Sequence, residues 1–113
     1  MGIKGLECLK RAGEFSKVQR QGFRQKTHGL TLKAAPNNLE LCRWGFIVSR
    51  KVGTAVTRNR IRRVLKEIVC QVNTKPGFDV VLIAHPEVAN MDFQAVKSRL
   101  CLLLEKAGLV YNQ

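Results

Sequence analysis

Residues 57–72 constrain the fold of this chain more than any other segment. Apolar residues recur there at spacings of three and four, which places them along one face of an α-helix. Such a face must pack against a core, and Thr54 or Thr57 is the expected N-terminal cap. The apolar residues of this stripe are Ile61, Val64, Leu65, Ile68 and Val72.

The other face of the same helix is cationic. Five of the nine residues 58–66 are Arg or Lys, and Glu67 is the single acidic residue beside them. Like charges this close repel by a few tenths of a kcal/mol per pair, so a polyanion opposite them would stabilise the helix. Arginine predominates, and its planar fork suits phosphate. The pattern predicts a nucleic-acid partner.

Charge along the whole chain supports the same partner. The net charge is +12, and residues 1–66 hold 16 basic and 3 acidic side chains against 4 and 5 in the remainder. Solubility alone requires neither this excess nor this segregation. We therefore expect the first half of the chain to meet the polyanion.

The remaining helices and strands are predicted from the spacing of apolar residues and from the positions of turn residues. Residues 13–21 favour a short helix ended by Gly22, and residues 78–84 a buried strand. Residues 30–33 and 43–49 favour strands, and the turn signal at 36–38 between them predicts an antiparallel hairpin. A last helix should begin near Asn90 or Asp92 and stop at Gly108.

This order predicts an α+β fold, a two-layer αββαβα sandwich with a small mixed sheet. The strand from residue 43, the basic helix and the strand from residue 78 form a βαβ crossover whose strands should be parallel. The length fits a single domain over residues 1–113, with residues 1–12 as a loose arm.

Cysteine usage and hydropathy indicate the compartment. Four cysteines stand singly, without metal-site spacing, and we expect buried free thiols: Cys8, Cys42, Cys70 and Cys101. The chain shows neither a signal peptide nor the ~20 apolar residues of a membrane span. The expected location is the cytoplasm, with no membrane partner.

A longer block of residues carries a resemblance. Residues 46–66 contain Ser49-Arg50-Lys51-Val52-Gly53 and then Ala55-Val56-Thr57-Arg58-Asn59-Arg60. Together with Phe15, Val18, Gly22 and the strand at 79–84, this block resembles the bacterial ribonuclease P protein family over roughly residues 9–108. The resemblance implies that the βαβ crossover is left-handed, against the usual preference.

The resemblance also implies a function. The chain would be the protein subunit of ribonuclease P, an endoribonuclease that removes the 5′ leader of precursor tRNA. It would bind the catalytic RNA as a 1:1 ribonucleoprotein, together with the precursor. Hydrolysis would belong to the RNA subunit and its Mg²⁺. We expect no catalytic side chain, metal, cofactor or small-molecule substrate on the protein, whose carboxylates are scattered and whose His28 and His85 are far apart in sequence.

Two sets of site residues follow from the family pattern. The cationic helix would bind the catalytic RNA through Arg58, Asn59, Arg60, Arg62, Arg63 and Lys66. The leader would lie between the first helix and the sheet, along Phe15, Arg11, Arg20, Lys33, Arg50 and Lys51. Phe15 could stack on a base or belong to the core, and both interpretations stay open. Gln19 and Lys33 depart from the family, because many members have an aromatic residue at the first position and some have a tyrosine at the second.

Two other functions fit part of this pattern. A structural RNA-binding protein of the ribosomal type would share the charge and the architecture. A DNA-binding regulator could place the basic helix in a major groove, but no helix is predicted immediately before it, as a helix-turn-helix requires.

Overall fold

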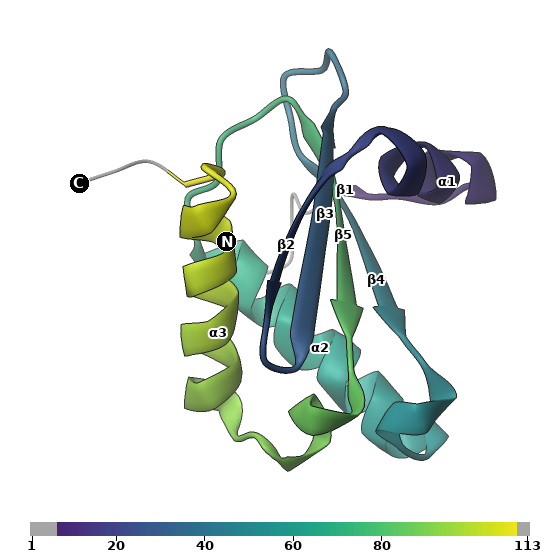
Figure 1. The fold of residues 1–113 in the computed structure, drawn as a ribbon, viewed down its shortest axis with the longest axis vertical. Helices are drawn as coiled ribbons and strands as arrows, with labels where there is room; N and C mark the ends of the chain where they lie inside the picture. The colour runs from purple at the N-terminus through teal and green to yellow at the C-terminus, as the bar shows by residue number, and fades with distance from the viewer. Residues whose placement is uncertain (1–6, 111–113) are drawn as a thin grey trace.

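The computed structural model describes residues 7–110, apart from the Gln21 side chain. Its elements are β1 (Glu7–Cys8), α1 (Ala12–Gln21), β2 (Phe23–Thr27), β3 (Leu30–Pro36), β4 (Arg43–Val48), the 3₁₀ turn η1 (Arg50–Val52), α2 (Ala55–Gln71), β5 (Phe78–Ala84), the 3₁₀ turn η2 (Pro86–Asn90) and α3 (Phe93–Lys106). Figure 1 shows their arrangement.

The five strands form one mixed sheet in the order β1-β4-β5-β3-β2. β4 and β5 are parallel, as the crossover predicts. The hairpin expected between residues 30–33 and 43–49 is wrong, because β5 lies between β3 and β4 and pairs with both. A strand buried on both faces is most stable at the centre, and β5 takes that place. The actual hairpin joins β2 to β3 through His28 and Gly29, whose φ of +85° suits a tight turn.

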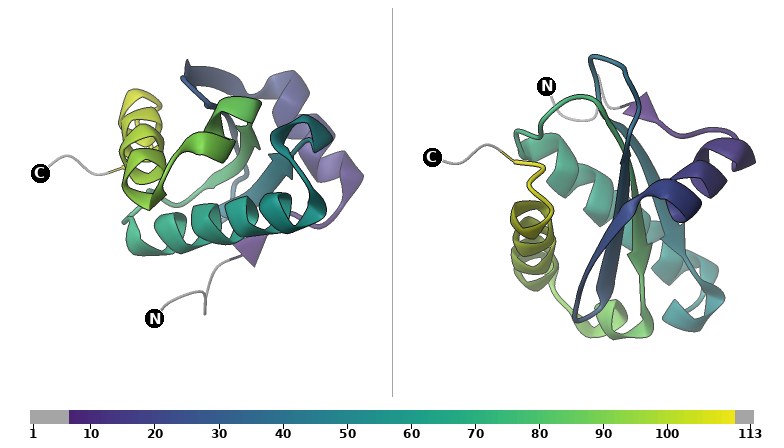
Figure 2. Two further views of the ribbon diagram at one scale, coloured as in Figure 1. Left: turned by 90° about the horizontal axis from the view of Figure 1, so that it is seen from below. Right: turned by 45° about the horizontal axis from the view of Figure 1, so that its top comes forward.

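Helices cover both faces of the sheet, so the two expected layers become three. One face packs against α2 and α3 through a large apolar cluster that includes Leu32, Leu65 and Leu103. The other face packs against α1 through a smaller cluster that includes Val18, Ala35 and Val81. Figure 2 shows α1 on the opposite side of the sheet from α2 and α3. Below, the α1 face means the sheet surface that carries α1.

The connection from β4 through α2 to β5 is left-handed. In Figure 1 both strands run downward, α2 passes behind the sheet, and β5 lies to the left of β4. Most parallel crossovers have the opposite hand. This hand places α2 beside β4 and on the face away from α1.

Helix ends follow the local sequence. The Thr54 side chain accepts a hydrogen bond from the Thr57 amide (3.3 Å) and caps α2, and Asp92 caps α3 by accepting from the Ala95 amide (2.8 Å). Gly108, with φ of +71°, follows α3. The expected positions of all three signals are confirmed.

The start of the chain is more ordered than expected. β1 pairs with β4, and Leu9 is buried in the cluster beneath α1, so residues 7–12 are not a loose arm. Residues 1–6 lie outside the described residues. All four cysteines are free, as expected, but half-buried rather than buried. No helix within residues 7–110 is long and apolar enough to span a membrane.

Candidate nucleic-acid interface

The outer side of α2 carries a row of cationic and polar side chains. We call it the docking face, formed by Asn59, Arg62, Arg63 and Lys66. Asn59 and Arg63 are exposed, and Arg62 donates a hydrogen bond to the Asn59 side chain (2.9 Å). Val56, four-fifths exposed, lies on the same side one turn earlier. All four residues lie away from the apolar stripe, but Arg62 and Lys66 are half-buried beside β4.

The other two members of the helix set lie apart from this face. The Arg58 side chain is half-buried and donates to the Gly53 carbonyl (3.3 Å), so it ties α2 to the turn that precedes it. Arg60 borders a small cavity between α2 and the start of α3. Both positions lie at the edges of the apolar stripe, which the spacing indicates.

The docking face has no anionic partner within the described chain. The ion pairs between residues 7–110 both involve Arg43, which contacts Glu14 and Asp79. Charges of one sign that are left unpaired on a rigid helix are an electrostatic cost to the isolated protein and an attraction for phosphate.

On the α1 face, Phe15 packs directly against the sheet. Its ring lies so close to Gly45 that a Cβ atom there would come within 2.3 Å of Phe15 Cε1. The ring is half-buried, packs with Leu9 and Val18, and borders a surface pocket. The structure thus makes Phe15 a partly exposed member of the smaller core.

The rest of the predicted leader set is spread along this side of the molecule. Arg11 and Arg20 are exposed at the two ends of α1, while Arg50 and Lys51 are exposed in η1, at the other end of β4. Arg50 stands five positions after Gly45 along extended chain, a distance of roughly 17 Å. The set forms an extended track and not a single pocket.

Lys33 lies on the α1 face in the middle of this track. Its ammonium group donates to the Gln19 side chain on α1 (3.1 Å), so the two residues that depart from the family pattern contact each other. Strand register places Arg24 beside Lys33 and Lys26 beside Thr31 on the same face. Neither cation is in the predicted site, because residues 23–27 are not predicted to form a strand; the alternation of Arg24 and Lys26 is the available signal.

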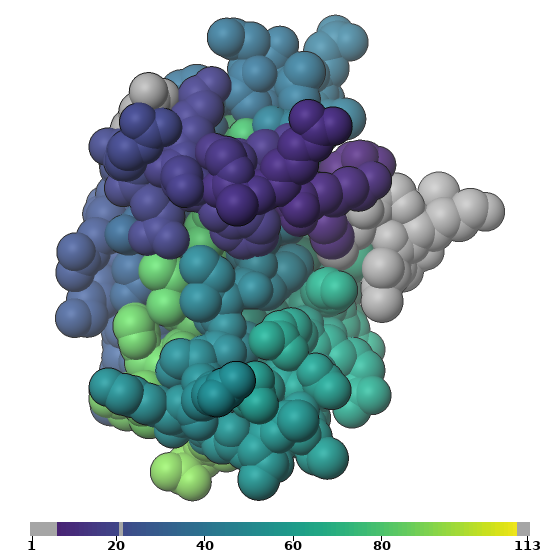
Figure 3. All heavy atoms as spheres, turned by 90° about the vertical axis from the view of Figure 1, so that its right-hand side faces the viewer, coloured from purple at the N-terminus to yellow at the C-terminus, as the bar shows by residue number. Residues whose placement is uncertain are grey.

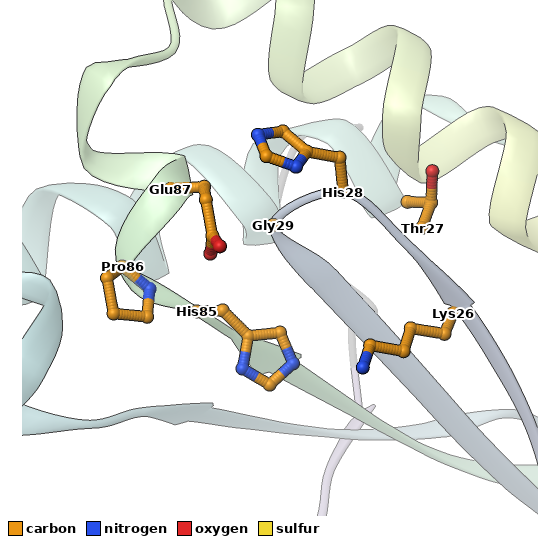
Figure 4. Close-up of a pocket in the computed structure, with 7 residues that line it drawn as sticks. All are labelled: Lys26, Thr27, His28, Gly29, His85, Pro86 and Glu87. Atoms are coloured by element: carbon orange, nitrogen blue, oxygen red, sulfur yellow. The ribbon is translucent and has the colours of Figure 1, made fainter.

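A surface pocket of about 290 Å³ lies on the α1 face at the turn between β2 and β3. Figure 4 shows the Lys26 and His85 side chains extending toward each other across it. His85 also shares a hydrogen bond with the Thr31 hydroxyl (2.7 Å). The remaining lining residues are Thr27, His28, Gly29, Pro86 and Glu87.

An ionic network fixes α1 on the sheet. Arg43 in β4 donates two hydrogen bonds to the buried Asp79 carboxylate (2.8 and 2.7 Å) and one to Glu14 in α1 (2.9 Å). Asn37 also donates to Asp79 (2.9 Å). Burial raises the pKa of Asp79, but the hydrogen bonds from Arg43 and Asn37 outweigh it and leave that pKa lowered. The amides of Lys10 and Arg11 donate to Glu14 and lower its pKa.

Within residues 7–110, no group of three or more His, Cys, Asp or Glu side chains is arranged to hold a metal ion. Two carboxylates on the α1 side of the sheet, Glu14 and Asp79, are both engaged by Arg43.

Comparison with known proteins places the chain among relatives of one kind. The family model for Ribonuclease P matches residues 3–108. The ribonuclease P protein component of Dehalococcoides mccartyi is 40% identical over 108 residues, covering 96% of this chain and 90% of the relative. That of Pelotomaculum thermopropionicum is 35% identical over 110 residues, covering 95% and 97%.

Solved structures agree in fold. The RNase P protein of Staphylococcus aureus superposes with a TM-score of 0.84 at 24% identity, covering 91% of this chain and 96% of that one. The RNase P protein of Thermotoga maritima gives a TM-score of 0.80 at 26% identity, covering 88% and 96%. By the family model and by these relatives, the chain belongs to the ribonuclease P protein family.

Proposed function

We propose that this chain is the protein subunit of a bacterial ribonuclease P. In this proposal the docking face binds the catalytic RNA in a 1:1 complex, and the α1 face holds the 5′ leader of precursor tRNA. The observation that carries the proposal is the docking face itself, a rigid row of cations with no anionic partner among residues 7–110.

Phosphate binding explains this row better than solubility does. A partner that neutralises the cations removes their mutual repulsion and releases condensed counterions, which favours binding at moderate salt. Arg62 and Arg63 offer planar forks for bidentate phosphate contacts, and Lys66 adds a third charge. A folded RNA of irregular shape suits a single exposed helix face.

The α1 face suits a single strand. Cations are spread along it from Arg20 through Lys33 to Arg50 and Lys51, so several successive phosphates could be neutralised in turn. Phe15 offers a ring edge to a base, and Lys33 offers a charge where some family members have a tyrosine. The leader would therefore be held by charge more than by stacking.

Hydrolysis in this proposal belongs to the RNA subunit, whose bound Mg²⁺ ions supply the chemistry. The residues of this chain position the two RNAs relative to each other and neutralise their phosphates. Engagement of Glu14 and Asp79 by Arg43 supports this division, because it leaves neither carboxylate free to bind a metal ion. The proposed place of action is the cytoplasm.

Reconstitution tests the proposal. The protein would be added to a bacterial ribonuclease P RNA with precursor tRNA at low Mg²⁺ and moderate salt, and leader release followed. We expect faster cleavage than with the RNA alone. Binding to RNA without any stimulation of cleavage would instead support the ribosomal type of RNA-binding protein.

A further inference from the structure

The pocket of about 290 Å³ at the turn between β2 and β3 contains no residue of the predicted leader set. In Figure 3, β2 and β3 lie at the left edge of this side of the molecule, below α1, and the end of β5 lies beside them. We call this site the turn pocket. Its lining residues are Lys26, Thr27, His28, Gly29, His85, Pro86 and Glu87.

The turn pocket continues the track that would hold the leader. His85 follows β5, and Val81, four residues earlier, packs in the same apolar cluster as Phe15. Four residues of extended chain span roughly 13 Å. Between them the α1 face carries Ile83 and Ile47, which are paired in register and half-buried. An unpaired strand that contacts Phe15 can therefore extend over an apolar floor to the turn pocket.

The two sides of the turn pocket are fixed relative to each other. The His85 amide donates to the Gly29 carbonyl (2.9 Å), which ties the start of η2 to the hairpin turn. A Cβ atom at Gly29 would lie 3.0 Å from the Met91 side chain and 3.7 Å from that of Glu87. The Thr31 hydroxyl is hydrogen-bonded to Nε2 of the His85 ring, which leaves Nδ1 for a ligand. A pocket held in this way needs little rearrangement to bind one.

The lining of the turn pocket offers hydrogen-bond acceptors and donors at separate places. Figure 4 shows His28 pointing toward Glu87 at one end, while Lys26 and His85 point toward each other at the other. Glu87 has no ion-pair partner among residues 7–110, where both ion pairs involve Arg43. Lys26 would attract a phosphate, but the Glu87 carboxylate would repel it. A ligand with donors on one edge and acceptors on another fits this lining better.

Guanine is the RNA base with that arrangement. Its Watson–Crick edge carries two adjacent donors, N1–H and the N2 amino group, which match the two oxygens of a carboxylate. Its O6 and N7 atoms are acceptors, and a lysine commonly binds this pair. Adenine, cytosine and uracil each have an acceptor next to their one Watson–Crick donor group. A carboxylate that faced them would therefore meet a lone pair in place of a second donor.

We propose that the turn pocket binds one guanine base of the 5′ leader and distinguishes it from the other bases. Glu87 accepts hydrogen bonds from N1–H and from the N2 amino group. Lys26 and His85 donate to O6 and N7. The leader is single-stranded, so both edges of the base are free for these contacts. The inference rests on the proposed function, and it adds base specificity to a strand otherwise held by charge.

A scan of the leader sequence tests the specificity. Precursor tRNAs of one leader length carry each of the four bases at each leader position in turn, and their affinity for the reconstituted enzyme is measured. We expect one position at which guanine gives about tenfold tighter binding than the other bases. Glu87→Gln replaces one acceptor oxygen with a donor and should abolish this preference. Glu40→Gln, which removes the same charge from the exposed loop after β3, should retain it.

Two kinds of failure can be told apart in this scan. If the wild-type protein stimulates cleavage but shows no guanine preference at any position, the inference is wrong. It is also wrong if Glu87→Gln and Glu40→Gln retain the preference equally, or if the position that Glu87→Gln affects prefers another base. A wild-type protein that binds RNA without stimulating cleavage would instead reject the proposed function.

A photoreactive base tests the location. The preferred guanine is replaced by thioguanine, in which sulfur takes the place of O6, and the reconstituted complex with precursor tRNA is irradiated. We expect cross-links to the peptides that contain Lys26 or His85, and their loss when the thioguanine is moved to a distant leader position. If the preferred position gives no cross-link to these peptides, or gives cross-links only to α1 or to the docking face, the inference is overturned.

Discussion

Arg43 holds two carboxylates at once, Asp79 in β5 and Glu14 in α1. Asp79 interrupts an otherwise apolar strand, and its burial would be costly without these bonds. The network decides where α1 sits relative to the sheet, and therefore where Phe15 and Gln19 lie. The sequence places Asp79 within the strand at 78–84 but does not identify its partner, because Arg43 is 36 residues away.

Replacing Asp79 with Asn should destabilise the protein. Asn retains one acceptor but loses the charge that Arg43 binds, so we expect the free energy of unfolding to fall by about 2 kcal/mol at neutral pH. Chemical denaturation measures this difference. The same change at the exposed Glu105, Glu105→Gln, serves as the control and should cost little. Equal losses in the two variants would show that the network does not stabilise the fold.

The lowered pKa values of Asp79 and Glu14 also predict acid sensitivity. A carboxyl group with a lower pKa in the folded state stabilises the fold above its unfolded pKa, and this contribution disappears as the pH falls through the folded value. The wild-type free energy of unfolding should therefore decline below about pH 4. In Asp79→Asn the decline should be shallower. Parallel pH profiles for the two proteins would contradict this assignment.

Gly22 ends α1 for a different reason from the one its sequence position indicates. Its backbone is extended (φ −80°), so it needs no left-handed conformation. It is required because a Cβ atom would lie 2.5 Å from the Val18 carbonyl oxygen and 2.6 Å from that of Ala34. Spacing along the sequence locates the helix end but cannot reveal contact with a neighbouring strand.

Two glycines in and after α1 should therefore respond oppositely to alanine. Gly22→Ala forces main-chain atoms apart and should lower the free energy of unfolding by about 1–3 kcal/mol. Gly13→Ala, where nothing lies within 4 Å of the new Cβ, should raise it by about 0.5–1 kcal/mol. Urea denaturation of both variants decides the point, and stabilisation by Gly22→Ala would refute the close contact.

At the scale of elements, the spacing of apolar residues predicted the helices better than it predicted which strands are neighbours in the sheet. α2 and α3 follow their apolar stripes, because a helix face can be read from spacing alone. β2 was missed because residues 23–27 include only one apolar side chain and pair with a single strand at the sheet edge. The wrong hairpin arose because turn residues between two strands do not exclude a third strand inserted later.

The β2–β3 hairpin places three cations on the α1 face: Arg24, Lys26 and Lys33. Lys33→Ala removes the charge on the α1 face that contacts Gln19. If this charge compensates for a missing aromatic residue, the affinity for precursor tRNA with a leader should fall several-fold, in proportion to about one phosphate contact. Affinity for mature tRNA, which lacks the leader, should not change. Unchanged affinity for the precursor would remove this role for Lys33.

At the scale of the whole molecule, the sheet separates two surfaces. The left-handed crossover puts α2 and its docking face on one side, while α1 and its track of cations occupy the other. The β4 edge joins them, since Phe15 and Arg62 line one pocket there. A protein built this way could hold two RNAs on opposite faces and fix their separation by the thickness of one sheet. The left hand of the βαβ crossover could be predicted only from the family resemblance, because no local sequence pattern determines it.

The central claim is that the docking face binds the catalytic RNA, and salt-dependent affinity tests it most directly. The triple variant with Arg62, Arg63 and Lys66 replaced by Gln is compared with one in which Lys97, Arg99 and Lys106, in α3, are replaced by Gln. Both variants lose the same charge. We expect the first to bind ribonuclease P RNA about tenfold or more weakly, with its logarithmic salt slope reduced by about 2–3. The second should match the wild type, and equal losses in the two variants would contradict the account.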